Sequence, residues 1–353
     1  MIRILMITVR SDFGGGPRHV DQLVKKLPEE CYIYMAYPEK GDPYAELWKK
    51  SDRIKGTIHI PYRKFSIKTL FELRAFIKQN RIDIVHSHGN GAGFYSRLLK
   101  ISGIKAKVVH TFHGISDEYS SKIKYLISLV VGKTLKFFAD RYIAVSKGEL
   151  KLGIELGFCK ETNSCVIYNG IDDEGTGLRK FGEKEIVTLS RYDYQKNMSL
   201  CLDIVRLLKD DKVRFVWVGD GEDFVAMKEI VEMEKLPVDL VGFQKEPMKF
   251  LKKAVIYLST SRFEGLPYAL IEAASVGLPL VATDVKGNNE VAINGENGIT
   301  YKTAEEGAAA LRRILGDKLV YDKMSSKSRK IFEDKFTVKV MIEDLMKLYK
   351  SLN

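Results

Sequence analysis

The fold of this chain is decided by residues 261–272, which read SRFEGLPYALIE. The preceding residues 254–258 form a short apolar run of the kind found in strands that are buried in parallel sheets. Pro267 suits the first turn of a helix, and Gly277 followed by Pro279 predicts where that helix ends. The stretch is therefore predicted to join a buried strand to a helix through a short loop.

Two acidic residues of this stretch lie on either side of the predicted helix start. Glu264 falls in the loop, and Glu272 lies about 7.5 Å along the helix at about 1.5 Å per residue. Between them are the free N–H groups of the first turn, whose partial positive charge suits phosphate. Since carboxylates accept hydrogen bonds from vicinal hydroxyls, this order fits a sugar, a diphosphate and a ribose laid end to end. We therefore predict a nucleotide-sugar site.

A second segment, residues 185–197, supplies cationic side chains to the same site. Its apolar strand pattern ends just before Arg191, and Lys196 follows in the next loop or the first helical turn. Both side chains can therefore converge on a leaving diphosphate.

The spacing of Glu264 and Glu272 resembles the E-x7-E motif of the retaining glycosyltransferases of family 4, which have the GT-B fold. Arg191 and Lys196 match the phosphate-binding pair of that family. The resemblance spans nearly the whole chain, and its other landmarks are Gly14-Gly15-Gly16, His113-Gly114, Ala144-Val145-Ser146 and Asn169-Gly170-Ile171-Asp172. Residues 286–290 depart from the pattern, because they read KGNNE where the family has two glycines before the last Glu.

The resemblance implies an α/β fold with two Rossmann-like, doubly wound domains that face each other across a cleft. Alternating strand and helix patterns agree with such a fold, with strands expected at residues 2–8, 31–36, 57–60, 82–86, 107–111, 141–145, 186–189, 213–218, 238–241, 255–258 and 280–283. We expect an N-terminal acceptor-binding domain over residues 1–170, a linker over 171–184 and a C-terminal nucleotide-sugar-binding domain over 185–336. A helix over residues 337–353 either crosses back to the first domain, as the resemblance implies, or caps the second.

The resemblance also implies the reaction, which is transfer of a hexose with retention from a nucleotide-sugar, and UDP is the usual nucleotide. Arg191 and Lys196 would stabilise the leaving diphosphate, Glu264 would orient the sugar, and His113 would hold the sugar from the other domain. Glu272 would orient the ribose. The implied donor-binding residues are Gly15, Gly16, Arg191, Lys196, Phe243, Glu264, Gly265, Leu266, Glu272, Asn288 and Asn289.

Four further residues are candidates for binding the acceptor. Arg18 and His19 begin the predicted helix after the Gly14-Gly15-Gly16 loop, and His86 and His88 lie at or just past a predicted strand end. Ligands of doubly wound sheets bind outside the carboxyl ends of strands, which favours this role. For each histidine, a ring that is simply hydrogen-bonded to nearby backbone is an equally good interpretation.

No cofactor or metal is expected. The chain has no Asp-x-Asp triplet that could clamp a metal–diphosphate complex. The glycine loop is not a G-x-G-x-x-G dinucleotide fingerprint, since Arg18 and His19 follow it, and this argues against a nicotinamide enzyme. The four cysteines include no C-x-x-C pair and are expected to be reduced.

The distribution of charge predicts a partner. Residues 1–175 hold 28 Lys and Arg against 19 Asp and Glu, so most of the net charge of +11 lies in the expected acceptor domain. There Lys122, Lys124, Lys133 and Lys136 surround the apolar residues 125–131, an arrangement that suits anionic lipid headgroups. A core helix with a solvated basic rim is the alternative.

Location and partners follow from these patterns. Arg10 interrupts the first apolar run after six residues, and no long uncharged run follows, so we expect a cytoplasmic protein bound peripherally to the inner face of the plasma membrane. The expected acceptor is a glycan or a polyprenyl-diphosphate-linked glycan. Two alternatives are a GT-B sugar-nucleotide epimerase and a basic nucleic-acid-binding protein, although no nucleic-acid motif is present.

Overall fold

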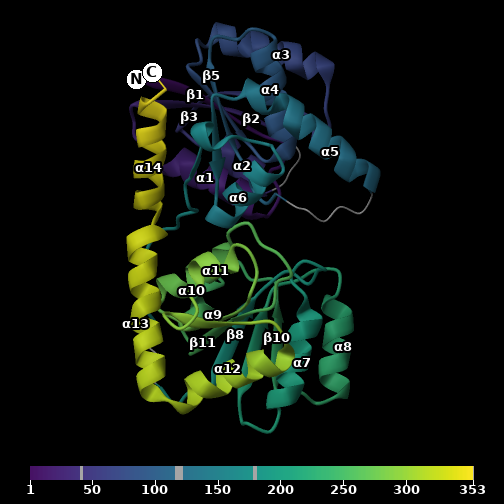
Figure 1. The fold of residues 1–353 in the computed structure, drawn as a ribbon, viewed down its shortest axis with the longest axis vertical. Helices are drawn as coiled ribbons and strands as arrows, with labels where there is room; N and C mark the ends of the chain where they lie inside the picture. Colours follow the sequence, from purple (N-terminus) through teal and green to yellow (C-terminus); the bar gives the residue numbers. More distant parts are fainter. Residues whose placement is uncertain (40–42, 116–121, 178–180, 353) are drawn as a thin grey trace. The chain divides into compact units, whose positions relative to one another are not determined.

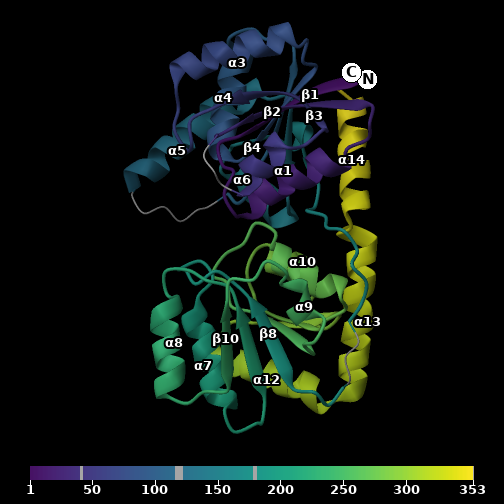
Figure 2. The same cartoon turned by 180° about the vertical axis from the view of Figure 1, so that it is seen from behind.

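The computed structural model describes residues 1–39, 43–115, 122–177 and 181–352. The chain divides into two compact units, and each is a parallel sheet with its own helices (Figures 1 and 2). Unit 1 comprises Met1–Gly170 together with Val338–Asn353, and unit 2 comprises Ile171–Thr337. The units divide between Gly170 and Ile171, which is where the first domain was expected to end and the linker to begin.

The described part of unit 1 contains a seven-stranded parallel sheet in the order β3-β2-β1-β4-β5-β6-β7. Its strands are β1 (Ile2–Thr8), β2 (Cys31–Tyr37), β3 (Ile54–His59), β4 (Ile84–His88), β5 (Lys107–Thr111), β6 (Arg141–Ala144) and β7 (Ser164–Val166). The order reverses between β1 and β4, and such a switch point opens a crevice at the carboxyl ends of the strands.

Unit 1 has an apolar core on each face of its sheet, because neighbouring residues of a strand point to opposite faces. Ile4 and Met6 of β1 belong to one core, whereas Leu5 and Ile7 belong to the other. The helices of unit 1 are α1 (Gly15–Lys26), α2 (Pro43–Lys49), α3 (Ile67–Gln79), α4 (Asn90–Ile101), α5 (Lys122–Leu135), α6 (Lys147–Glu155) and α14 (Val338–Lys350), with short 3-10 turns η1 (Lys136–Phe138) and η2 (Glu161–Asn163).

Helix α14 packs on the first of these cores, beside α1. Its buried side chains lie on one helical face and are Met341, Ile342, Leu345, Met346 and Tyr349. The hydroxyl of Tyr349 lies 2.6 Å from the Nδ1 of His86. Figures 1 and 2 both draw the N- and C-termini side by side on unit 1. The helix therefore completes unit 1 although it follows unit 2 in sequence.

The described part of unit 2 repeats the same plan with a six-stranded parallel sheet in the order β10-β9-β8-β11-β12-β13. Its strands are β8 (Glu185–Leu189), β9 (Arg214–Val218), β10 (Val238–Gly242), β11 (Ile256–Ser259), β12 (Leu280–Thr283) and β13 (Gly298–Tyr301). Its helices are α7 (Met198–Leu208), α8 (Phe224–Met233), α9 (Met248–Leu251), α10 (Tyr268–Ser275), α11 (Asn288–Val291), α12 (Ala304–Gly316) and α13 (Lys318–Lys335). The switch point lies between β8 and β11.

Some boundaries differ from those expected. Helix α1 starts at Gly15, three residues before the expected start, and Pro267 precedes α10 instead of lying in its first turn. Part of the expected linker is tied to unit 2, since Arg329 of α13 donates a hydrogen bond of 2.8 Å to Asp173. Linker residues 178–180 lie outside the described part of the chain.

No helix in the described part of the chain is long and apolar enough to cross a membrane.

Candidate active site

The cations and the first carboxylate of the predicted site come together at the switch point of unit 2. Arg191 and Lys196 follow β8, and Glu264 follows the adjacent strand β11. The Nζ of Lys196 lies 2.5 Å from Oε1 of Glu264. Both side chains are largely buried, with exposed fractions of 18% and 8%. Parallel neighbouring strands end at the same edge of a sheet, which is why these distant segments meet.

The carboxylate of Glu264 is held by further donors. The hydroxyl of Ser261 donates to Oε1 at 2.8 Å, and the amide of Gln195 donates to Oε2 at 3.3 Å. Sequence patterns did not assign a role to either residue. Gln195 directly precedes Lys196, and Ser261 lies three residues before Glu264; this closeness in sequence is the signal that could have identified them.

Gln195 connects the two loops of the site. Its amide donates to the carbonyl of Phe263 at 3.0 Å, and its Oε1 accepts a hydrogen bond of 3.1 Å from Arg191. Its own carbonyl accepts a hydrogen bond of 2.8 Å from the backbone N–H of Arg262. Arg191 is also paired with Asp193 at 3.0 Å, and its side chain is 59% exposed. The guanidinium of Arg191 is therefore positioned but accessible to an anion.

Glu272 lies in the second half of α10 and is 5% exposed, whereas Gly265 and the buried Leu266 form the loop before the helix. The N–H groups of the first turn of α10 begin at Tyr268, between the two glutamates in sequence. The predicted order of carboxylate, helix N-terminus and carboxylate is therefore present in unit 2.

The KGNNE turn packs against the loop that carries Glu264. Gly287 has a φ of 80°, and a Cβ there would lie 2.6 Å from the carbonyl oxygen of Gly265. Asn288 is fully buried, and its amide donates to the carbonyl and hydroxyl of Thr283 at 3.1 and 3.0 Å. The amide of Asn289 donates to Asp284 at 2.6 Å. Both asparagine amides thus bond to unit 2 itself.

Phe243 directly follows Gly242, the last residue of β10, and is 51% exposed. Strand β10 lies at the edge of the sheet, two strands from β8. The ring thus lies at the same carboxyl edge of the sheet as the loops described above, where it offers an aromatic surface.

In unit 1, the loop that holds His113 is anchored by Glu149 of α6. The backbone N–H groups of Gly114 and Ile115 donate to Oε1 of Glu149 at 2.6 and 3.0 Å, and that of Val145 donates to Oε2 at 2.8 Å. Ser146 caps α6 by accepting a hydrogen bond from the N–H of Glu149 at 3.1 Å. We infer that Glu149 fixes the loop. The sequence signal for Glu149 is its Ser-x-x-Glu spacing from Ser146, which is typical of a helix start.

Three histidines gather at the switch point of unit 1. His19 follows β1 on α1, His88 ends β4, and half-buried His113 follows β5. The Nδ1 of His88 lies 3.3 Å from the Nε2 of His113, and the Nδ1 of His19 lies 3.0 Å from the Oδ1 of Asn169. Gly16 adjoins His113, because a Cβ on Gly16 would lie 3.8 Å from that ring. Burial lowers the pKa of His19 to about 4 and those of His88 and His113 well below their usual value.

The acceptor role expected for His86 does not fit the structure. His86 lies inside β4 and is fully buried. Its Nδ1 contacts the hydroxyl of Tyr349, and its Nε2 contacts the hydroxyl of Thr111 at 2.7 Å. Both ring nitrogens are engaged within unit 1, so His86 is a core residue. Half-buried Arg18 lies one residue before His19 on α1.

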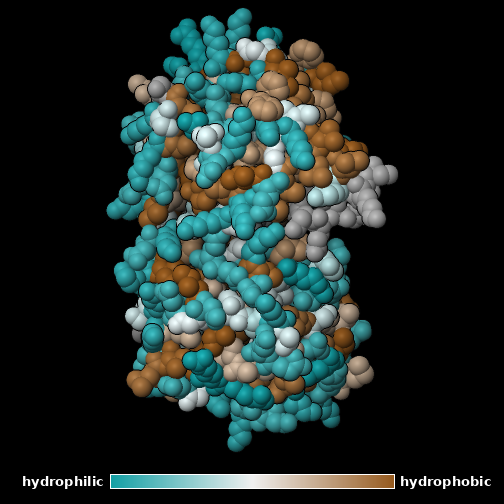
Figure 3. All heavy atoms as spheres, viewed as in Figure 1, coloured by the Kyte–Doolittle hydropathy of each residue, from teal (hydrophilic) through white to brown (hydrophobic). Residues whose placement is uncertain are grey.

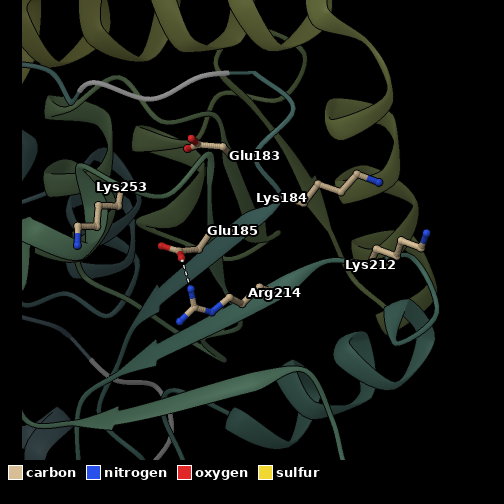
Figure 4. A pocket seen from close by; sticks show the side chains of 6 residues that line it. All are labelled: Glu183, Lys184, Glu185, Lys212, Arg214 and Lys253. Atoms are coloured by element: carbon tan, nitrogen blue, oxygen red, sulfur yellow. Dashed lines mark hydrogen bonds and ion pairs between the residues drawn. The ribbon is translucent and has the colours of Figure 1, made fainter.

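An open hollow in unit 2 lies away from Lys196 and Glu264. Figure 4 shows the charged side chains that line it, which are Glu183, Lys184, Glu185, Lys212, Arg214 and Lys253. These residues lie at or just before the starts of β8, β9 and β11, so the hollow is at the edge of the sheet opposite to the candidate site. Arg214 is paired with Glu185 at 3.2 Å. The hollow is therefore no part of the donor site.

The family described as Glycosyltransferase Family 4 matches residues 13–174, and the family described as Glycosyl transferases group 1 matches residues 174–331. The two matches adjoin near the boundary between the units and together account for most of the chain. The chain is therefore a glycosyltransferase, and its two parallel-sheet domains confirm the predicted GT-B fold.

The chain is similar to individual proteins over most or all of its length. It is 26% identical to the O-antigen biosynthesis glycosyltransferase WbnH of Escherichia coli, over 100% of this chain and 99% of WbnH. It is 28% identical to the E. coli UDP-Gal:alpha-D-GlcNAc-diphosphoundecaprenol alpha-1,3-galactosyltransferase, over 80% and 79% of the two chains. The crystal structure of Anabaena HepE in complex with UDP-glucose superposes with a TM-score of 0.83, at 17% identity, over 99% of this chain and 100% of HepE.

Proposed function

We propose that this glycosyltransferase transfers a hexose from a UDP-sugar to a lipid-linked glycan, with retention, during assembly of a surface polysaccharide. The observation that carries the proposal is the meeting of Lys196 and Glu264 at the switch point of unit 2, with Arg191 held beside them through Gln195. Two cations and a carboxylate in one crevice suit the diphosphate and the sugar hydroxyls of a nucleotide-sugar.

The chemistry assigns a role to each of these side chains. As the bond between the sugar and the diphosphate breaks, negative charge grows on the leaving group, and Arg191 and Lys196 offset it. Glu264 orients the sugar through its hydroxyls, and Glu272 orients the ribose. His113 contacts the sugar from unit 1. Since two fixed cations do the work of a divalent ion, the proposed reaction uses neither a metal nor another cofactor.

The donor assignment has support from both units and from relatives. The N-terminal end of α10 carries the positive end of the helix dipole, which suits phosphate, and exposed Phe243 offers a surface on which a base can stack. Gly265 and Leu266 belong to the Glu264 loop, and Asn288 and Asn289 belong to the turn that packs against it. Gly15 and Gly16 start α1 in unit 1. HepE was crystallised with UDP-glucose, and the related galactosyltransferase is named for UDP-Gal.

The acceptor assignment rests on the relatives and on the surface of α5. One relative is named for a diphosphoundecaprenol-linked acceptor, and two others for O-antigen and capsular polysaccharide synthesis. On α5, Leu126, Ile127 and Val130 are more than half exposed. Figure 3 shows hydrophobic side chains over the part of unit 1 where α5 lies. We propose that this helix lies on anionic lipid at the cytoplasmic face of the plasma membrane. We also propose that Arg18, His19 and His88 are acceptor-side residues.

The test combines donor binding with transfer. UDP-, GDP- and ADP-sugars are compared by thermal shift, where a ligand at about 100 times its dissociation constant adds roughly 2.7 kcal/mol of stability. UDP-hexoses are then incubated with detergent-solubilised polyprenyl-diphosphate-linked GlcNAc, and the anomeric configuration of the product is determined by NMR.

We expect stabilisation by UDP-sugars and an α-linked product from an α-linked donor. An inverted product would contradict retention. Conversion of the donor to its epimer without an acceptor would favour the epimerase alternative. Salt-sensitive binding to DNA or RNA, without any response to nucleotide-sugars, would replace the proposal altogether.

A further inference from the structure

The histidine cluster of unit 1 has the composition of a transition-metal site. One ring nitrogen from each of His19, His88 and His113 lies within 4.8 Å of the others. These three residues come from α1, from the end of β4 and from the loop after β5, so the topology of the sheet brings them together. Three imidazoles with an open fourth position are a ligand set that zinc takes in proteins.

Distances within the cluster fit shared coordination. The Nδ1 of His88 lies 3.3 Å from the Nε2 of His113. Two nitrogens bound to a tetrahedral zinc by bonds of about 2.1 Å are separated by roughly 3.4 Å, so the two distances agree. The same distance is long for a hydrogen bond between two rings. The third ring needs a small rotation, because the ligand atoms are spread over as much as 4.8 Å.

A hydrogen bond orients the ring of His19 for coordination. At His19, Nδ1 faces the Oδ1 of buried Asn169 at 3.0 Å, which places its proton on Nδ1 and leaves the lone pair on Nε2. An outer partner of this kind orients a histidine for coordination.

We infer that His19, His88 and His113 form a binding site for a divalent transition-metal ion of the zinc class. Neutral imidazoles suit zinc, cobalt and nickel, whereas magnesium and calcium prefer oxygen ligands, so those two ions are excluded. The proposed chemistry at Arg191, Lys196 and Glu264 of unit 2 needs no metal, but it shares His113 with this site. A bound ion occupies His113, so it blocks that ring and inhibits transfer; this consequence rests on the proposed function.

The binding test uses the full chain with any affinity tag removed and with metals stripped by a chelator that is then dialysed away. Co²⁺ is titrated, and its visible d–d absorption is recorded; Zn²⁺ should then displace it. We expect saturation at one equivalent, without the charge-transfer absorption that thiolate ligands give. Absence of a d–d spectrum, or a thiolate spectrum from the cysteines, would overturn the inference.

Variants separate the cluster from adventitious binding. His19→Gln and His88→Gln should abolish the Co²⁺ spectrum, whereas His59→Gln, which alters an exposed histidine that lies 3.8 Å from Glu39, should not. If the cluster variants fail to fold, Asn169→Ala provides the test, since loss of an outer partner weakens metal binding about 10- to 100-fold. An unchanged affinity in Asn169→Ala, or an equal loss in His59→Gln, would overturn the inference.

The inhibition test is read separately. Zn²⁺ at saturating concentration should lower the transfer rate of the wild type, and EDTA should restore it. Binding of Co²⁺ without inhibition by Zn²⁺ would leave the cation site standing and would contradict the proposed role of His113 in transfer.

Discussion

Glu264 takes hydrogen bonds from Lys196, Gln195 and Ser261, so its position depends on the loops after both β8 and β11. A carboxylate held in this way cannot reorient freely. It is therefore suited to recognise hydroxyls in one fixed arrangement. The same hydrogen bonds bring the Lys196 ammonium to a defined place, where a diphosphate can compete for it.

Replacing either partner of this pair should abolish most of the transfer while leaving the fold intact. Glu264→Gln removes the charge, and Lys196→Ala removes a cation that we propose stabilises the leaving group, a role in which loss of one donor costs about 10²- to 10³-fold in rate. The check is kcat with saturating donor, together with Tm. Lys228→Ala, on exposed α8, is the control. Turnover near that of the wild type in either site variant would remove the assignment.

Gly287→Ala should displace the loop that carries Glu264. A Cβ at this position would lie 2.6 Å from the carbonyl of Gly265, and the φ of 80° disfavours any side chain. We expect a loss of about 1 kcal/mol or more in stability and a larger proportional loss of transfer, since the Glu264 loop must shift.

Gly295→Ala is the matched control for Gly287→Ala. Gly295 has a φ of 76°, but nothing lies within 4 Å of a Cβ added there. The two variants therefore share the backbone strain and differ only in the close approach. Equal loss of transfer in both, measured as kcat alongside Tm, would show that the contact with Gly265 has no part in positioning Glu264.

At the scale of elements, helix α5 offers Leu126, Ile127 and Val130 to the surface, with exposed Lys133 and half-buried Lys136 at its end. The side chains of Lys122 and Lys124 lie outside the described part of the chain. Basic residues near anionic lipid contribute about 1 kcal/mol each. The chain should therefore co-sediment with vesicles that contain anionic lipid, and added salt should weaken this binding.

Charge reversal locates the contact. Lys122, Lys124, Lys133 and Lys136 changed together to Glu should lower co-sedimentation. The same change in Lys228, Lys323, Lys327 and Lys330 of unit 2 should leave it unchanged. Equal losses from the two sets would rule out α5 as the membrane contact.

Asp140 joins α4 to the start of β5 and should contribute to acid sensitivity. Burial opposes its ionisation, but Lys100 at 2.8 Å and the N–H of Val108 at 2.7 Å outweigh burial and lower its pKa below the ordinary 3.8. A lowered folded-state pKa stabilises the fold above the unfolded value, and this stability is lost as pH falls through the folded value. Asp140→Asn should thus lower Tm at pH 7, and its deficit should shrink below about pH 4. A deficit independent of pH would contradict this.

Strands could be predicted from short runs rich in β-branched and apolar residues, and β1, β5 and β12 have the expected bounds. Strand β7 was missed because it has only three residues, all half-buried. Strand β13 was missed because it begins at a glycine. The meeting of Lys196 with Glu264 could be anticipated, since parallel strands end at one edge. The particular partners of Glu149 and Gln195, 35 and 69 residues away, were not predicted, because strand and helix patterns do not specify the loop geometry on which these hydrogen bonds depend.

For the molecule as a whole, we expect transfer to persist in EDTA. The chain has no Asp-x-Asp triplet, and in the proposed site Arg191 and Lys196 supply the positive charge that a metal would provide. Initial rates with and without chelator are the measurement. A rate that collapses in EDTA and returns with Mg²⁺ or Mn²⁺ would contradict this, whereas a rise in EDTA would agree with the inhibitory site at His19, His88 and His113.

Unit 1 is built from two separate segments of the chain, and this has a consequence for biosynthesis. Residues 1–170 leave the ribosome first, but the sheet face that α14 covers stays bare until residues 338–353 have been made. At about 5–20 residues per second, translation of the intervening unit takes on the order of 10 to 30 s. During that interval the nascent chain exposes an apolar surface that chaperones can bind. Unit 2 is one continuous segment, so it can finish folding before unit 1, although unit 1 begins earlier in the sequence.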